Sequence, residues 1–236
     1  EDGPMEVVSN PPAFPDARCD GLVVGADDWP PLLRPSVLAD EASYSRWERH
    51  MVWRCADEVL SPDSVIATLD RDARIVRQVQ PVSGQAIVRA IETLPPAAVV
   101  RTTPSALTES LALHDEAMAA VPREWRPARD VAGLEDAYGR HVAPRWGDWC
   151  LPLKRYLAAK AFASWTAYQG RGFLTIVRGL EASLALVRVE AARRCRDGST
   201  SLGEDQLREA FRQADFILNH LAAADELARA WSRVEM

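Results

Sequence analysis

The chain has 236 residues, of which 47% are hydrophobic and 26% charged, and its formal net charge is −6. That composition is globular, and the length suffices for one large or two small domains. The acidic balance argues against a dedicated nucleic-acid surface, which normally carries a basic excess. No apolar run reaches the roughly 18–20 residues that span a bilayer. We therefore expect neither nucleic acid nor a membrane as a partner.

The start of the chain is acidic and lacks the apolar core of a signal peptide. The cysteines Cys19, Cys55, Cys150 and Cys195 are widely separated, and no close pair indicates a zinc ribbon or a thioredoxin-type site. Scattered cysteines of this kind are typical of small buried groups in a reducing cytosol. These features predict a cytoplasmic protein, and the predominance of arginine over lysine indicates a GC-rich bacterial coding sequence.

Residues 1–35 form a proline-rich arm that holds seven of the 16 prolines. Proline fixes its own φ angle and removes a backbone donor, so long helices are excluded here. We predict an irregular arm with at most a short strand at residues 22–24. Trp29, Leu32 and Leu33 would attach it to the body, which is predicted as a helical domain over residues 36–236.

The first predicted helix covers residues 41–60, with Asp40 as its N-cap. Ser61 indicates a new start, because a serine cap followed by Pro62 is typical of a helix beginning. The second helix is predicted over residues 62–78. One face of the first helix carries regularly spaced apolar residues: Tyr44, Trp47, Met51 and Cys55.

Two further helices are predicted over residues 83–94 and 104–120. A Pro-Pro pair ends the first of them, and the segment that follows offers at most one β-bridge at Val99-Val100. Residues 121–150 are the least regular stretch of the body. There we predict a helix over 130–142, capped by an aspartate, and then a loop, so this stretch is a candidate domain junction or functional loop.

The carboxyl-terminal third is strongly helical in pattern. A helix over residues 152–168 is interrupted by two glycines, and a long helix over 173–196 follows, ending before Gly198. A last helix or pair of helices starts after Gly203, with Asp225 capping the final turn. The chain is therefore predicted to be an all-α protein, an irregular bundle of six to nine helices behind the proline-rich arm.

Aromatic and arginine residues gather in the irregular stretch and in the turn after it. Both residue types are enriched at interface hot spots, because they combine contact area with directional polar groups. They also anchor loops onto bundles, and that alternative stays open. The candidate binding residues are Trp125, Arg126, Arg145, Trp146, Trp149, Trp165, Tyr168 and Arg171. In the turn, two glycines permit close backbone approach, and the next helix start could hold an anion.

We predict a binding or accessory protein that engages a protein or peptide partner through this aromatic and arginine surface, with homo-oligomerisation also open. The alternative is an all-α enzyme with a metal or cofactor pocket, acting in peptide or protein modification. Asp136 and His141 are the candidate acid/base pair. Cys55, Cys150 and His141 are the candidate metal ligands. This alternative requires at least three of these groups to converge, and the sequence identifies no cofactor.

Two stretches resemble the helical portion of bacterial cysteine-cluster proteins of the lysine N-methylase-like type. They cover about a third of the chain and consist of helix-forming residues: Trp47-Glu48-Arg49-His50-Met51, preceded by Asp40-Glu41, and Tyr156-Leu157-Ala158-Ala159-Lys160-Ala161-Phe162 with Tyr168-Gln169-Gly170. The resemblance implies a helical body. The close-set cysteine cluster that defines the family is absent from this sequence, so no metal site, methyl transfer or site residue is carried over.

Overall fold

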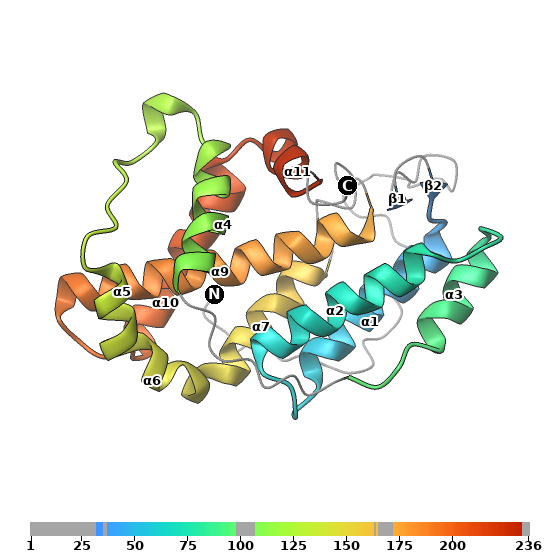
Figure 1. The fold of residues 1–236 in the computed structure, drawn as a ribbon, viewed down its shortest axis with the longest axis horizontal. Helices are drawn as coiled ribbons and strands as arrows, with labels where there is room; N and C mark the ends of the chain where they lie inside the picture. Colours follow the sequence, from blue (N-terminus) through green and yellow to red (C-terminus); the bar gives the residue numbers. More distant parts are fainter. Residues whose placement is uncertain (1–31, 35–36, 98–106, 163, 165–171, 233–236) are drawn as a thin grey trace, which may run out of the picture.

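A computed structural model describes residues 32–34, 37–97, 107–162, 164 and 172–232. In these residues the chain is an all-α bundle with one minor two-stranded sheet (Figure 1). The described part contains eight α-helices of nine or more residues, which confirms the predicted fold class. None of its helices is both long and apolar enough to cross a membrane.

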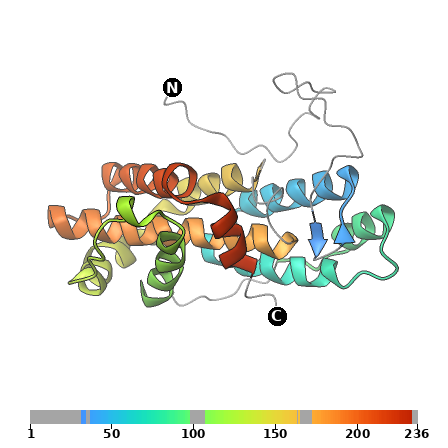
Figure 2. The same ribbon diagram turned by 90° about the horizontal axis from the view of Figure 1, so that it is seen from above.

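Helix α9 (Phe173–Gly198) is the centre of the bundle. Its 26 residues give a length of about 39 Å at the standard rise. It runs between α10 (Glu204–Phe216) and α7 (Cys150–Ala161) on one side and α4 (Leu107–Ala119) and α2 (Pro62–Arg77) on the other (Figure 2). Because neighbours cover it from both sides, it is buried on nearly every face rather than along one stripe.

The amino-terminal helices begin where their caps predict. The side chains of Asp40, Ser61 and Ser83 each accept a hydrogen bond from the backbone N–H three residues later, and each thereby satisfies a donor that the helix itself leaves free. These caps start α1 (Glu41–Ala56), α2 and α3 (Gly84–Glu92). The predicted end of the first helix at residue 60 was wrong, because the backbone becomes extended at position 57.

A short hairpin precedes α1 and corrects the prediction of an irregular arm up to residue 35. Strand β1 (Leu32–Arg34) pairs antiparallel with β2 (Val37–Leu38). Leu33 is fully buried in the bundle core, which confirms its predicted role as an anchor. Gly172, at φ +129°, meets this strand so closely that an added Cβ would lie 2.7 Å from the Leu33 carbonyl oxygen. Residues 22–24, Trp29, Val99 and Val100 lie outside the described residues.

The predicted loop over residues 144–150 was also wrong, because the chain is helical there. Pro144 lies in the first turn of a helical segment, where its missing N–H leaves no donor unsatisfied. The helix predicted over 130–142 begins only at Leu134, after Gly133. Asp130 therefore does not cap this helix, and its side chain forms an ion pair with Arg196. The segments are η2 (Arg123–Trp125), α5 (Leu134–Ala137), the π-helical η3 (Tyr138–Val142), α6 (Ala143–Trp146) and η4 (Gly147–Trp149).

The end of the chain follows the prediction with shifted bounds, except that Asp225 lies within the first turn of the last helix instead of capping it. Helix α7 ends at Ala161 rather than 168, because Phe162 has an extended backbone. After α10, a π-helical turn, η5 (Ile217–Leu221), leads into α11 (Ala224–Ser232). One hydrophobic cluster runs from Leu33 of the hairpin to Trp231 of α11 and includes buried residues of the 121–150 stretch.

Candidate functional site

The predicted tryptophans differ strongly in exposure. Trp125 is 61% exposed, whereas Trp146 is only 6% exposed and its ring lies 4.9 Å from the Arg188 guanidinium. Trp149 is partly buried against the core. Of these three, only Trp125 therefore offers most of its ring to a partner.

The predicted arginines are already engaged with the protein. Arg126 donates to the carbonyls of Ala119 and Val121 at 2.9 and 2.8 Å. Arg145 forms an exposed ion pair with Asp148 at 2.7 Å. Trp165, Tyr168 and Arg171 lie outside the residues that the structure describes.

The polar groups of the enzymatic alternative do not converge. Asp136 is exposed and pairs with Arg140, one turn later. The Cys55 thiol lies in the core, where burial raises its pKa to about 12, and the Cys150 thiol approaches the Leu60 carbonyl at 3.6 Å. Throughout the described residues, no three His, Cys, Asp or Glu side chains are arranged to hold a metal ion. His141 therefore shares no metal-binding group with either cysteine.

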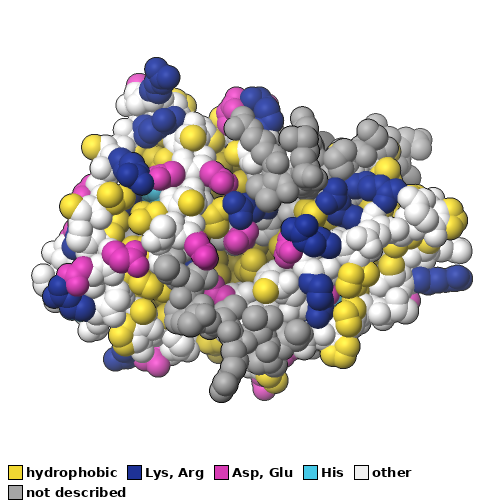
Figure 3. Space-filling model, viewed as in Figure 1, with side chains coloured by type: hydrophobic (Ala, Val, Ile, Leu, Met, Phe, Trp, Pro, Cys, Tyr) yellow, Lys and Arg dark blue, Asp and Glu magenta, His cyan; other side chains and the backbone are white. Residues whose placement is uncertain are grey.

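A groove lies between α2 and α4, with α9 as its floor and Trp231 of α11 at one end. We call it the α2–α4 groove. It has a volume of about 410 Å³, within the range of ligand sites. In Figure 3, hydrophobic atoms lie at the bottom of a hollow in this face, with charged side chains of both signs along its edges. The apolar lining consists of Ile66, Ala67, Leu113, Leu174, Val177, Leu184, Ala185 and Trp231.

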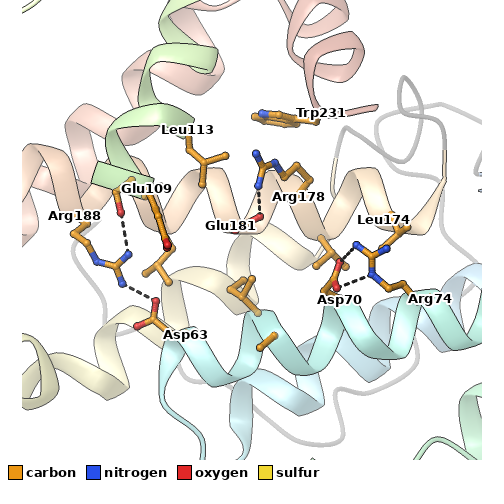
Figure 4. A pocket seen from close by; sticks show the side chains of 16 residues that line it. Asp63, Asp70, Arg74, Glu109, Leu113, Leu174, Arg178, Glu181, Arg188 and Trp231 are labelled. Carbon is orange, nitrogen blue, oxygen red and sulfur yellow. Dashed lines mark hydrogen bonds and ion pairs between the residues drawn. The ribbon is translucent and has the colours of Figure 1, made fainter. Parts of the chain in front are cut away.

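Each arginine of the groove is neutralised by a carboxylate in the groove (Figure 4). The atom distances are 2.6 Å between Arg188 and Asp63, 2.6 Å between Arg178 and Glu181, and 2.8 Å between Arg74 and Asp70. Arg188 is only 4% exposed and also donates to the Ser110 hydroxyl at 3.0 Å. These contacts hold the edges in place before any ligand arrives.

Glu109 is the carboxylate of the groove that takes part in none of these ion pairs. Four carboxylates and three arginines line the groove, which gives an excess of one negative charge. The Glu109 side chain is exposed on α4 and forms no ion pair with any described residue. A cation at this edge would therefore gain a partner without displacing an existing one.

Sequence reasoning missed this groove because its residues come from four helices that are distant in sequence. One local signal was present. Arg188 interrupts an otherwise apolar stretch of the longest helix, and an arginine at such a position must find a buried partner. The candidate tryptophan that does belong near the groove, Trp146, acts behind it by packing on Arg188.

No protein-family model, curated protein or solved structure matches this chain. The likeness to lysine N-methylase-like proteins therefore stays a prediction, and the site rests on its own geometry.

Proposed function

We propose that this protein binds a peptide segment of a partner protein in the α2–α4 groove. The observation that carries the proposal is the combination of an apolar floor with edges whose ion pairs are already complete. A partner that buries apolar side chains on that floor gains about 25 cal/mol of binding free energy per Å² of apolar surface removed from water. It does not have to break the arginine–carboxylate pairs to do so.

The charge of the groove defines the partner further. Because Glu109 is left without a counterion among the described residues, a lysine or arginine beside the apolar face of the peptide would be favoured. An amphipathic helix laid into a groove between two helices is a recurring mode of peptide recognition. The segment we propose is therefore apolar on one face and basic at its flank.

This proposal keeps the predicted kind of surface and changes its location. The aromatic and arginine residues are Trp231, Arg74, Arg178 and Arg188 of the groove, with Trp146 behind them. The proposed setting is the cytoplasm. The thiols of the three described cysteines, which form no disulfide, are compatible with a reducing compartment.

The test is fluorescence anisotropy with a labelled amphipathic peptide of leucine and lysine at helical spacing. The matched variants are Ala67→Arg, which places a long side chain in the groove from an exposed position of α2, and Ala42→Arg, exposed on α1 away from the groove. We expect Ala67→Arg to weaken binding about tenfold or more, equivalent to about 1.4 kcal/mol. Ala42→Arg should leave the affinity unchanged.

A second pair of variants tests the charge. Glu109→Lys should weaken the leucine–lysine peptide and improve binding of a leucine–glutamate peptide of the same pattern. Glu124→Lys makes the same change of charge at an exposed position outside the groove. Equal effects of the two substitutions, or equal binding of both peptides by the unaltered protein, would contradict the proposed site. If the unaltered protein self-associates and Ala67→Arg abolishes this, the occupant of the groove is a second copy of this chain and not a partner protein.

A further inference from the structure

A second pocket lies between α1 and α3, outside the α2–α4 groove, and we call it the α1–α3 pocket. It has a volume of about 530 Å³. Four of its lining residues fall on one face of α1, spaced as i, i+3, i+4 and i+7: Arg46, Arg49, His50 and Trp53. Ile91, Leu94, Pro95 and Pro96 supply an apolar wall opposite them. The pocket thus combines cations with flat and apolar surfaces.

A buried carboxylate fixes the polar side of this pocket. Asp72 of α2 is fully buried and accepts hydrogen bonds from His50 Nε2 at 2.8 Å and from the guanidinium groups of Arg54 and Arg71 at 3.2 and 2.6 Å. Burial alone would raise the pKa of this carboxyl, but the hydrogen bonds from His50 and Arg71 and the charge of Arg54 together lower it. An ionised Asp72 therefore holds all three side chains in position.

The same two arginines fix the opposite wall. Arg54 donates to the Pro95 carbonyl at 2.8 Å, and Arg71 donates to the carbonyls of Pro95 and Pro96 at 3.2 Å each. These bonds attach the segment after α3 to the buried charge cluster. The pocket is therefore formed before any ligand is present, which reduces the entropy lost on binding.

Three groups of the pocket remain available to a ligand. Arg49 is exposed and forms no ion pair with a described residue; its Nε donates to the Ser45 carbonyl within α1. Trp53 is 48% exposed, and the Arg54 guanidinium lies 4.8 Å from the centre of its ring. His50 uses Nε2 on Asp72, and its Nδ1 has no hydrogen-bond partner in the described part of the chain. Arg49 and Trp53 make none of the hydrogen bonds to Asp72, whereas His50 belongs to the buried cluster through Nε2 and offers a ligand only its Nδ1.

The local charge is opposite to that of the whole chain. Four arginines and only two carboxylates lie around the pocket: Arg46, Arg49, Arg54 and Arg71, and Asp72 and Glu92. The chain as a whole has a net charge of −6. A local excess of arginine on an acidic protein favours an anion, and guanidinium groups bind carboxylates with two parallel hydrogen bonds.

We propose that the α1–α3 pocket binds a small organic anion with a flat apolar ring, of the class of aromatic carboxylates. The carboxylate lies against Arg49, beside Arg46, which is already paired with Glu92 at 3.3 Å. The ring stacks on Trp53 opposite the two prolines. The volume suits a molecule of this size. This site does not depend on peptide binding in the α2–α4 groove.

The test is isothermal titration with three probes: 2-naphthoate, its neutral analogue 2-naphthamide, and inorganic phosphate. We expect 2-naphthoate to bind more tightly than either of the others. Arg49→Ala and Trp53→Ala should each weaken it about fivefold or more, since the first removes a charge-assisted hydrogen bond and the second a stacked ring. Both side chains are exposed, so the thermal melting temperature should stay close to that of the unaltered protein.

Two controls make the outcome decisive. Arg212→Ala removes an exposed arginine of α10, and Ala67→Arg blocks the other groove; both should leave 2-naphthoate binding unchanged. Equal binding of 2-naphthamide would overturn the role of the anion, and equal binding of phosphate would overturn that of the ring. No binding of 2-naphthoate, or binding unaffected by Arg49→Ala and Trp53→Ala, would reject the pocket as its site.

Discussion

At the scale of single residues, Asp72 has the most demanding position in this protein. It is fully buried, and its charge is matched by Arg54, which is buried beside it, and by the partly exposed Arg71. Removing a carboxylate from such a group leaves a guanidinium in the interior without a counterion. The desolvation of that cation is then no longer offset.

We expect Asp72→Asn to lower the free energy of unfolding by about 3–5 kcal/mol, the usual loss when one partner of a buried ion pair is removed. Urea denaturation followed by circular dichroism measures the change. Asp70→Asn is the matched control, because Asp70 lies two residues earlier on α2 and its ion pair with Arg74 is largely exposed. That substitution should cost at most about 1 kcal/mol, and an equal loss in both variants would show that Asp72 has no special role.

The same residue predicts a dependence on pH. A carboxyl whose pKa is lowered by folding stabilises the fold above its unfolded pKa of about 3.9. This stabilisation is lost as the pH falls through the lower, folded pKa. On acidification below about pH 4, the unaltered protein should therefore lose more stability than Asp72→Asn does. Acid titrations of the stability of both proteins measure this. Equal losses of stability in the two proteins would contradict the prediction.

At the scale of elements, local signals predicted local structure. Asp40, Ser61 and Ser83 marked helix starts correctly, because a cap needs only a side chain and a backbone N–H three residues away. Pro144 was read as part of a loop although it opens a helical turn. A proline is compatible with both, and packing of the neighbouring Trp146 against the core decides between them.

The α1–α3 pocket and the α2–α4 groove were both harder to predict than the helices that form them. The face of α1 that carries Arg46, Arg49, His50 and Trp53 is visible in the sequence as a helical spacing, but its meaning depends on Asp72 of another helix. The groove likewise requires the placement of α2, α4, α9 and α11 in space. Residue type alone left Trp146 open between a surface contact and an anchor of its segment on the bundle, and the fold places it under Arg188.

The junction between the hairpin and α9 allows a prediction at the scale of elements. Gly172 has φ +129°, and a Cβ there would lie 2.7 Å from the Leu33 carbonyl oxygen and 3.0 Å from the Arg34 Cα. Gly172→Ala should therefore lower the free energy of unfolding by about 1–3 kcal/mol or more through backbone strain. Gly147→Ala is the control, since a Cβ at this helical position meets no atom within 4 Å.

The control should be neutral or stabilising by up to about 1 kcal/mol, because alanine restricts the unfolded chain. Thermal unfolding of both variants measures the difference. A melting temperature of Gly172→Ala equal to that of the unaltered protein would show that the hairpin moves away from α9 without loss.

At the scale of the whole molecule, α9 packs against helices from both halves of the chain, and Arg188 is one of its polar links to them. Its guanidinium reaches Asp63 of α2 and Ser110 of α4 and lies over the Trp146 ring of α6. Four helices thus meet at one nearly buried charge. The α2–α4 groove keeps its shape only as long as these helices stay in register around it.

Arg188→Met should lower the free energy of unfolding by about 3–5 kcal/mol, because Asp63 then remains largely buried without its counterion. Adding Asp63→Leu should restore a large part of this loss, since apolar groups of similar size often replace a buried pair at little cost. Arg208→Met, at an exposed arginine of α10, should change stability by only about 0.5 kcal/mol.

Chemical denaturation of Arg188→Met, Asp63→Leu and the double variant gives the coupling energy between Arg188 and Asp63. If the two losses simply add, then Arg188 stabilises the bundle through its contacts with Trp146 and Ser110 rather than through Asp63, and the fixed edge of the groove must be attributed to those contacts.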